Sequence, residues 1–573
     1  MLADPLPFAI QTDPLDAIAV ISTDRTSAFS AWLAVTQKIF LTNSRGDEAW
    51  LNAIENQRRN SWLTHQPLGG RRNNLLKLLT TTTGNSDELT ALRKRVLARY
   101  PDVATNLSEI NVIRLLLQKS LWECRHMPRD TPVPDDSETW KDFAARSQTL
   151  ENQIDFIAAG RNVIPLEFPP LFETTEIRNR LVGKQRLLSF TWTNFGLFAS
   201  LEAPKQAASW KVKRPDEVRK KIIEMTRSLS LYHPLRPVET GRLDSQEWQT
   251  HAAALTTLLF EDSGVSLERH HEFDELIIVP DGLLWYLPFE LLPITTKEKN
   301  LHGATHLRLK DTCQIRYSPT RSLAVGNRHK ATAPHIIAVQ ASLTYRNNSP
   351  EQSSALLERI DTAIENAVFL NSQTPKIPIG ISASLADTLV IFDELSANGK
   401  ITDRPLIAAD AGRPGMSFND WLAAPQKAAR CAVLTGLQTQ ASEGLNKATD
   451  RPGNDLFMTA MDLLATGTET AVISRWNVGG RIGIDLGIEF IKDRQRERLG
   501  DNLLPAAVSW QRAVDLVTAE QPDFNQEPRI KITSSVIPQD ATHPFFWAGY
   551  ALIDCGILNA PEAPTDSKVE QVE

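Results

Sequence analysis

The side chains that could act as nucleophile or base are few and widely spaced in this chain of 573 residues. It contains four cysteines, Cys124, Cys313, Cys431 and Cys555. A cysteine nucleophile needs a base beside it, normally a histidine, yet no histidine occurs between His335 and His543. Cys431, the only cysteine in that interval, lies inside an apolar run, where burial disfavours a thiolate. The residue types therefore do not indicate an ordinary Cys–His pair within this interval.

The sequence also gives little indication of a metal site, a redox site or a pair of catalytic carboxylates. The cysteines form no Cys-x-x-Cys pair, so neither a zinc site nor a redox site is expected, and we expect no metal and no cofactor. Asp393 and Glu394 are adjacent carboxylates, but neighbours on an extended chain point to opposite faces. We expect this pair to be solvated or to cap a helix.

Composition restricts the classes of partner. Lys and Arg number 62 and Asp and Glu number 69, and 62 − 69 gives a net charge of −7, which argues against nucleic acid as the main partner. No apolar run of about 18 residues occurs, so no membrane span is expected. The N-terminus lacks a basic segment followed by an apolar one, and cysteines are sparse. These features predict a cytoplasmic protein.

The pattern of apolar residues predicts the elements that would position a site. Residues 1 to about 165 have helical spacing, and two strands with a hairpin turn are expected at Arg186–Thr193 and Gly196–Ala203. Further on, short apolar runs without alternation are typical of buried parallel strands: Leu276–Val279, His335–Val339, Thr388–Phe392, Cys431–Leu434 and Thr470–Ser474. Helical segments separate them. Strands alternating with helices predict a doubly wound α/β sheet, mostly parallel and flanked by helices, after a mainly α-helical N-terminal region.

Five motifs in a fixed order carry a family resemblance. Asp274–Pro293 contains a buried strand, the turn Pro280-Asp281-Gly282 and Pro288, and it resembles the strand and turn of CHAT domains, which are caspase-like peptidases related to separase. Four later segments resemble motifs of the same family, including those around Trp476 and Trp547: Arg316–Ser322, Gly453–Phe457, Ala471–Val478 and His543–Tyr550. We expect both tryptophans to anchor the core.

The resemblance divides the chain into four parts. Residues 1–165 would be a helical N-terminal region. No clean repeat of about 34 residues occurs there, so we expect either an irregular helical domain or degenerate units of the tetratricopeptide repeat, which is often fused to CHAT domains. Residues 166–330 would form the N-terminal part of the CHAT domain, a pseudo-caspase-like half with the hairpin. Residues 331–558 would form its C-terminal caspase-like part, and 559–573 a disordered polar tail.

The two catalytic positions of the family are substituted. CHAT peptidases use a His-x-Ala-x-His-Gly motif after one strand and a Leu-Ser-Ala-Cys-Glu-Thr motif after a neighbouring strand. Aligning Gly399 with the glycine of the first motif places Asn398 at the base, and Leu434–Thr439 places Leu437 at the nucleophile. A leucine side chain has no nucleophilic atom, and the amide of an asparagine does not act as a base near neutral pH. The neighbours Thr435, Gly436 and Gln438 are expected to keep the shape of the former oxyanion loop.

Three hypotheses follow from these substitutions. The first is a pseudo-peptidase that binds protein partners, either an extended peptide or an active protease relative, as a scaffolding or regulatory module. The second is an active cysteine peptidase with a non-standard pair, such as Cys313 or Cys555 with His543. The third is an inert structural domain whose former cleft is filled by Leu437 and its neighbours.

Overall fold

A computed structural model of the chain gives the arrangement of these segments. The structure describes residues 25–42, 47–80, 87–125, 127–128, 131, 137–160, 166–204, 206–229, 238–243, 245–265, 267, 273–295, 306–326, 336–341, 350–370, 379–393, 395–396, 406–407, 418–437, 439, 441, 445–446, 451–476, 480–496, 504–527, 530–533 and 540–556. The expected polar tail and the start of the chain lie outside these ranges.

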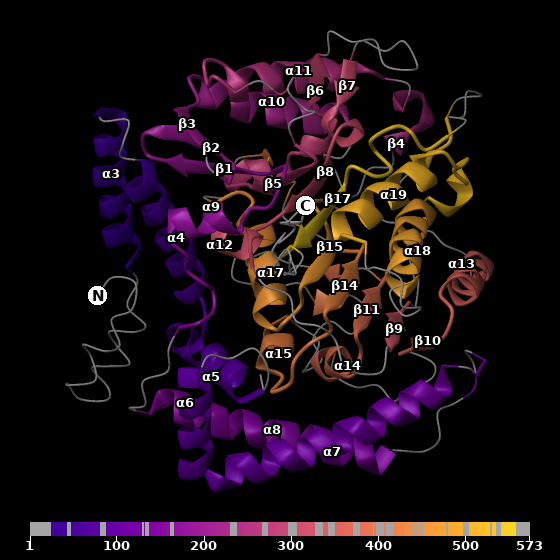
Figure 1. Cartoon of the computed structure of the whole chain (residues 1–573). Coiled ribbons are helices and arrows are strands. Elements are labelled where there is room, and N and C mark those ends of the chain that lie inside the picture. Colours follow the sequence, from indigo (N-terminus) through magenta and orange to yellow (C-terminus); the bar gives the residue numbers. More distant parts are fainter. Residues whose placement is uncertain are drawn as a thin grey trace, which may run out of the picture.

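An eleven-stranded sheet forms the centre of the molecule (Figure 1). Its spatial order is β10-β9-β11-β14-β15-β17-β8-β5-β1-β2-β3. The strands are β1 (Gln185–Thr193), β2 (Gly196–Glu202), β3 (Ala207–Lys211), β5 (Glu275–Val279), β8 (Gln314–Tyr317), β9 (Ile337–Gln340), β10 (Ala367–Phe369), β11 (Thr388–Ile391), β14 (Cys431–Leu434), β15 (Thr470–Ser474) and β17 (Tyr550–Asp554). Neighbours are parallel except at β15–β17, β1–β2 and β2–β3.

Every apolar run expected to be a strand lies in this sheet. The strands from β9 to β15 are buried along their whole length, because helices cover both of their faces. The expected hairpin is also present, with Thr193 opposite Gly196 across a two-residue turn. The predicted α/β architecture with a mostly parallel sheet is confirmed.

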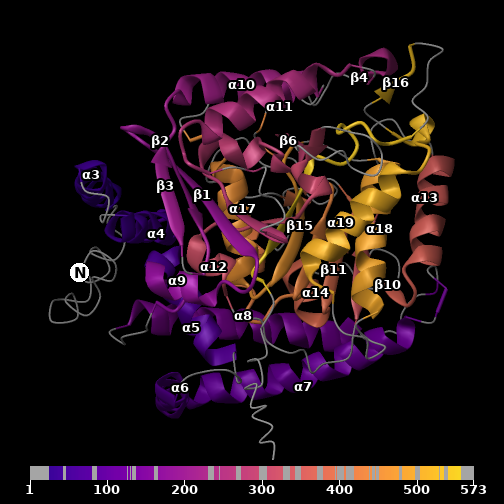
Figure 2. The same cartoon turned by 45° about the horizontal axis from the view of Figure 1, so that its top comes forward.

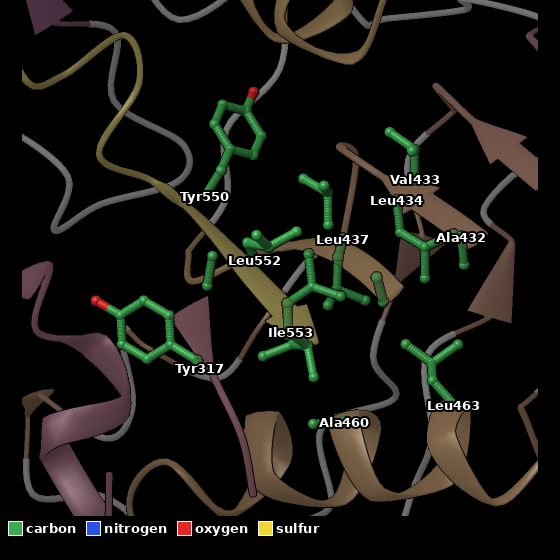
Figure 3. Close-up of a cluster of buried hydrophobic side chains, with 14 of the residues drawn as sticks. Tyr317, Ala432, Val433, Leu434, Leu437, Ala460, Leu463, Tyr550, Leu552 and Ile553 are labelled. Atoms are coloured by element: carbon green, nitrogen blue, oxygen red, sulfur yellow. The ribbon is translucent and has the colours of Figure 1, made fainter. Parts of the chain in front are cut away.

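Helices α17 (Asn454–Ala465) and α18 (Arg481–Arg496) cover opposite faces of the parallel strands. Leu434 and Ala432 point toward α17, whereas Val433 points away from it (Figure 3). On the other face, a Cβ added at Gly487 of α18 would lie 3.3 Å from Val433, so helix and strand approach closely there. Helix α19 (Ala506–Thr518) packs beside α18 and against β8 and β17, and α13 (Pro350–Ala363) packs on α18.

The N-terminal region is helical, as predicted, and borders the sheet domain on one side and below in Figure 1. Its helices are α3 (Thr26–Thr42), α4 (Asp47–Leu63), α5 (Arg71–Thr80), α6 (Asp87–Arg99), α7 (Pro101–Cys124) and α8 (Ser137–Ala159). Helix α7 begins earlier than the sequence pattern indicated, because Pro101 occupies a first-turn position that suits proline. The long helices α7 and α8 lie side by side (Figure 2).

Two further helices cover the hairpin half of the sheet. They are α10 (Pro215–Ser228) and α11 (Glu247–Phe260), which pack against each other. Pro215 occupies the first turn of α10, as expected. One cluster of buried apolar side chains extends from Trp62 of α4 to Ile553 of β17, so the helical region and the sheet share a core.

Buried arginines connect segments that lie far apart in the sequence. The guanidinium of Arg475, just after β15, donates to both carboxylate oxygens of Glu290 at 3.2 and 3.3 Å and lies over the ring of Tyr317. The hydroxyl of Tyr317 donates to Glu290 at 2.8 Å. Similarly, Arg321 donates to both oxygens of Glu202, each at 2.8 Å. Because these charges are removed from water, each needs its partner.

We expect Arg475→Ala to destabilise the chain by about 3–5 kcal/mol, because it leaves the charge of Glu290 buried without its cation. The matched control is Arg146→Ala on α8, where a partly exposed arginine pairs with Asp142, and its cost should stay within about 1 kcal/mol. Urea unfolding measures both variants. Equal losses in the two variants would contradict the central role of the Arg475–Glu290 pair.

Candidate functional site

The carboxyl ends of β11 and β14 lie side by side at one edge of the sheet. The two strands are parallel neighbours, with Ile391 opposite Leu434. In open α/β sheets, ligands and catalytic groups gather outside the carboxyl ends of strands. The segments that the sequence aligned with the base and nucleophile motifs follow these two strands along the chain.

Leu437 lies in the apolar core. Its side chain is 1% exposed. Figure 3 shows it among side chains of β14, β17 and α17, including Leu552 and Ile553. The residue aligned with a nucleophile therefore fills space in the core, and its side chain is closed to solvent.

Hydrogen bonds hold the loop after β14 against the end of β15. The Ser474 hydroxyl is close to the carbonyl oxygens of both Thr435, at 3.3 Å, and Leu437, at 2.9 Å, and donates to them. Thr439 donates from its hydroxyl to the carbonyl of Arg475 at 2.7 Å. Thr435 is 3% exposed and Gly436 is buried. These contacts keep the loop in place without a catalytic residue.

The remaining predicted residues of this site are only partly described. Asn398, Gly399 and Gln438 lie outside the described residues, so their expected positions stay predictions. Asp393 was expected in solvent or at a helix cap, but it is 5% exposed at the end of β11. The expectation of a solvated carboxylate is wrong because the sheet and its covering helices enclose the chain for two residues past the strand.

The Pro280-Asp281-Gly282 turn meets the start of α17. The hydroxyl of Tyr286 donates to Asp455 at 2.8 Å and accepts the N–H of Gly453 at 3.1 Å. A Cβ at Gly453 would lie 2.1 Å from the carbonyl oxygen of Gly282, so two motifs from distant parts of the chain touch through glycine. The contact excludes a side chain at Gly453, and an added Cβ at Gly282 would lie 2.8 Å from Trp192; both glycines have positive φ.

At this turn, the carboxylate of Asp281 interacts electrostatically with the guanidinium of Arg58 on α4. Asp281 accepts the N–H of Trp192 at 2.7 Å. Removal from water raises the pKa of Asp281, against the opposing effects of Arg58 and of the N–H groups of Trp192 and Gly282. Arg58 is 8% exposed and donates to the carbonyl oxygens of Pro280 and Pro319, each at 3.2 Å. The helical region thus completes the turn.

The other motif residues are structural in this arrangement. Trp476 is 1% exposed and Trp547 is 3% exposed, which agrees with the expectation that both anchor the core. Pro288 is buried beside Phe289, whose N–H donates to the hydroxyl of Tyr317 at 3.2 Å.

The four cysteines differ in burial. Cys124, Cys313 and Cys431 are buried and Cys555 is half-buried. Burial raises the pKa of Cys313 to about 12, so its thiol stays protonated near neutral pH. Cys313 borders a small cavity of about 30 Å³. His543 accepts the N–H of Phe545 at its Nδ1, at 3.1 Å.

Among solved structures, the chain has a partial likeness to separase. No family model matches the chain, and no curated protein matches it. Two crystal structures of the Saccharomyces cerevisiae separase–securin complex, at 2.6 and 3.0 Å resolution, contain a chain similar to this one at 10% and 9% identity. Each match has a TM-score of 0.35 and covers 97% of this chain and 48% of the other, so this chain spans about half of that chain's length. A TM-score of 0.35 does not establish a common fold.

Neither a metal-binding cluster nor a membrane-spanning helix is present among the described residues. No group of three or more His, Cys, Asp or Glu side chains is placed there to hold a metal ion. Among the same residues, no helix has the length and apolar character needed to cross a membrane.

Several residues that shape the site were not identified from the sequence. Ser474 and Arg475 hold the loop after β14, and Arg58 completes the turn at Asp281. A buried arginine or serine gives no local signal, because its partners come from other strands and helices. The glycines at 282 and 453 did give one, since turns that contain glycine are visible in the sequence.

We expect Leu437→Ala to lower the free energy of unfolding by about 2–5 kcal/mol, because it opens a cavity in a core that packs around the leucine. Leu516→Ala on α19 is the matched control, since Leu516 is 44% exposed, and its cost should be below about 1 kcal/mol. Chemical denaturation measures both. A small loss at position 437 would mean that the leucine lies in an open cleft.

The buried carboxyl group of Glu527 should make the free energy of unfolding depend on pH. It accepts the N–H of Ile482 at the start of α18, and burial raises its pKa from 4.5 to about 8. The folded chain then holds a proton that the unfolded chain releases, so this group makes stability fall as pH rises from 4.5 toward 8. The slope is at most about 1.4 kcal/mol per pH unit.

The variant Glu527→Gln keeps an oxygen for Ile482 and removes the titration. We expect its stability advantage over the natural chain to grow between about pH 5 and about pH 8, as measured by denaturant unfolding at each pH. Unfolding curves that keep a constant separation across this range would show that Glu527 is ionised in the folded chain.

Proposed function

We propose that this chain is a noncatalytic protein-binding module of the CHAT type, in which Asn398 and Leu437 stand in place of the catalytic histidine and cysteine. The burial of Leu437 carries the proposal. A nucleophile must reach a scissile carbonyl, whereas this side chain is 1% exposed and packs among leucine and isoleucine side chains. Neither a nucleophile nor access to one is provided at this position.

The pairing of β11 with β14 supports the alignment behind this proposal. A caspase-type dyad needs its base and its nucleophile after neighbouring parallel strands, and these two strands are paired in register through Ile391 and Leu434. The resemblance of five ordered motifs supports the same alignment. The buried thiols of Cys313 and Cys431 give no support to a peptidase with another pair.

An exposed apolar stripe supports a binding role. Val112, Leu115 and Leu116 on α7 are 57%, 57% and 56% exposed, and their spacing places them on one face of the helix. Large apolar side chains gathered on a surface commonly mark contact with a partner. We propose that this face of α7 binds a protein, either an extended peptide or an active protease relative.

A peptide probe with a thiol-reactive group tests the loss of catalysis in the full chain. We expect no stoichiometric labelling of any cysteine in the folded protein, and labelling only after denaturation exposes the buried thiols. Labelling of one cysteine at stoichiometry, lost when that cysteine is changed to serine, would establish a working nucleophile and overturn the proposal.

A displayed peptide library tests the binding role. We expect the immobilised full chain to enrich peptides over a scrambled control, and Leu115→Glu with Leu116→Glu to abolish the enrichment by placing charge in the apolar face. Lys220→Glu on α10 is the control, because Lys220 is exposed, pairs with Glu224 at the surface and lies on a different helix from the apolar face. No enrichment, or equal loss in the control, counts against α7 as the binding face.

A further inference from the structure

A second cavity lies away from Leu437, at the carboxyl ends of β1 and β5. Its volume is about 510 Å³, within the range of small-molecule sites. Its lining includes residues of α4, of the turn after β1, of the Pro280-Asp281-Gly282 turn and of the start of α17. Leu437 is not among the lining residues, so the cavity is separate from the site aligned with peptidase chemistry.

The walls of this cavity are tightly built. Gly282 packs under the indole of Trp192, where an added Cβ would lie 2.8 Å from the ring, and Gly453 packs on the carbonyl of Gly282. Asp281 holds the backbone of Trp192 through its N–H. The three segments therefore fix one another, and the cavity does not depend on a single mobile loop.

The charge of the lining is positive although the chain is acidic. Arg58, Arg219 and Arg451 line the cavity with one carboxylate, Asp281, and 3 − 1 gives +2. Within the described part of the chain, Arg219 of α10 has no carboxylate partner, and its guanidinium lies 5.9 Å from the centre of the Trp192 ring. A concave surface with an excess of positive charge attracts anions.

Polar atoms in the same lining lack partners among the described residues. They are Asn60 Oδ1, Trp192 Nε1 and Asn454 Nδ2, all buried. The side chain of Asn60 is 3% exposed. Buried polar atoms are nearly always hydrogen-bonded in folded proteins. Two donors and one acceptor around one cavity, beside an unpaired guanidinium, match an anion that also carries a hydrogen-bond donor.

We propose that this cavity binds a small organic anion whose carboxylate or phosphate pairs with Arg219 and whose apolar part packs against Trp192. The carboxylate and phosphate share the chemistry that a guanidinium recognises, two acceptor oxygens in one plane. The site goes beyond the proposed protein-binding role, because α7 and Leu437 take no part in it.

Calorimetric titration of the full chain tests the site with two anions and their neutral counterparts. The probes are adenosine 5′-monophosphate with adenosine, and N-acetyl-aspartyl-phenylalanine amide with its asparaginyl analogue. We expect at least one anion to bind, and its neutral counterpart to bind at least about tenfold more weakly, since a charge-assisted hydrogen bond contributes about 1.5–3 kcal/mol. The pair that binds identifies phosphate or carboxylate as the recognised group.

Two variants locate the binding. Arg219→Ala should weaken the binding of the anion by at least about tenfold. The matched control Lys220→Ala removes the neighbouring charge on α10, outside the cavity, and should change affinity by less than about twofold. Trp192→Phe removes the Nε1–H donor while keeping an aromatic ring, and it should weaken the binding of the same anion. Absence of binding by both anions, equal binding of the neutral counterparts, or equal losses in Arg219→Ala and Lys220→Ala would each overturn the proposal.

Discussion

The pairing of Arg475 with Glu290 inside the protein is the interaction on which the centre of the fold depends. Arg475 is completely buried, and its guanidinium donates to Glu290 and to the carbonyl oxygen of Ala548 and lies over the face of Tyr317. Such a charge is tolerated in a core only when its partners are held in place. Since those partners come from the segment before β8, from β8 itself and from the approach to β17, the pair fixes how the two halves of the sheet meet.

The loop after β14 depends on the same region. Arg475 follows Ser474, whose hydroxyl donates to the carbonyl of Leu437, and the carbonyl of Arg475 accepts from Thr439. A loop that positions a nucleophile in a peptidase would here be kept in shape by contacts that need no nucleophile. The buried side chain of Leu437 adds apolar packing to the core at this point.

The two candidate sites of this chain lie at different edges of one sheet. Around β11 and β14 the edge is closed by apolar side chains, whereas around β1 and β5 it opens into a cavity lined by arginines. Both lie at carboxyl ends of parallel strands, where the backbone leaves the sheet and side chains of several segments converge. The helical region contributes to the second edge through Arg58, so its position beside the sheet has a chemical consequence.

The sequence by itself determined the hairpin, the central parallel strands and the absence of a histidine between His335 and His543, because apolar periodicity and residue type are local properties. It also predicted the glycine turn at Gly282. Only the tertiary structure decided that Leu437 is packed inside the core, that Asp393 is buried and that Arg58, Arg219 and Asp281 line one cavity. Burial and charge pairing depend on segments hundreds of residues apart, and no local pattern records which of them meet.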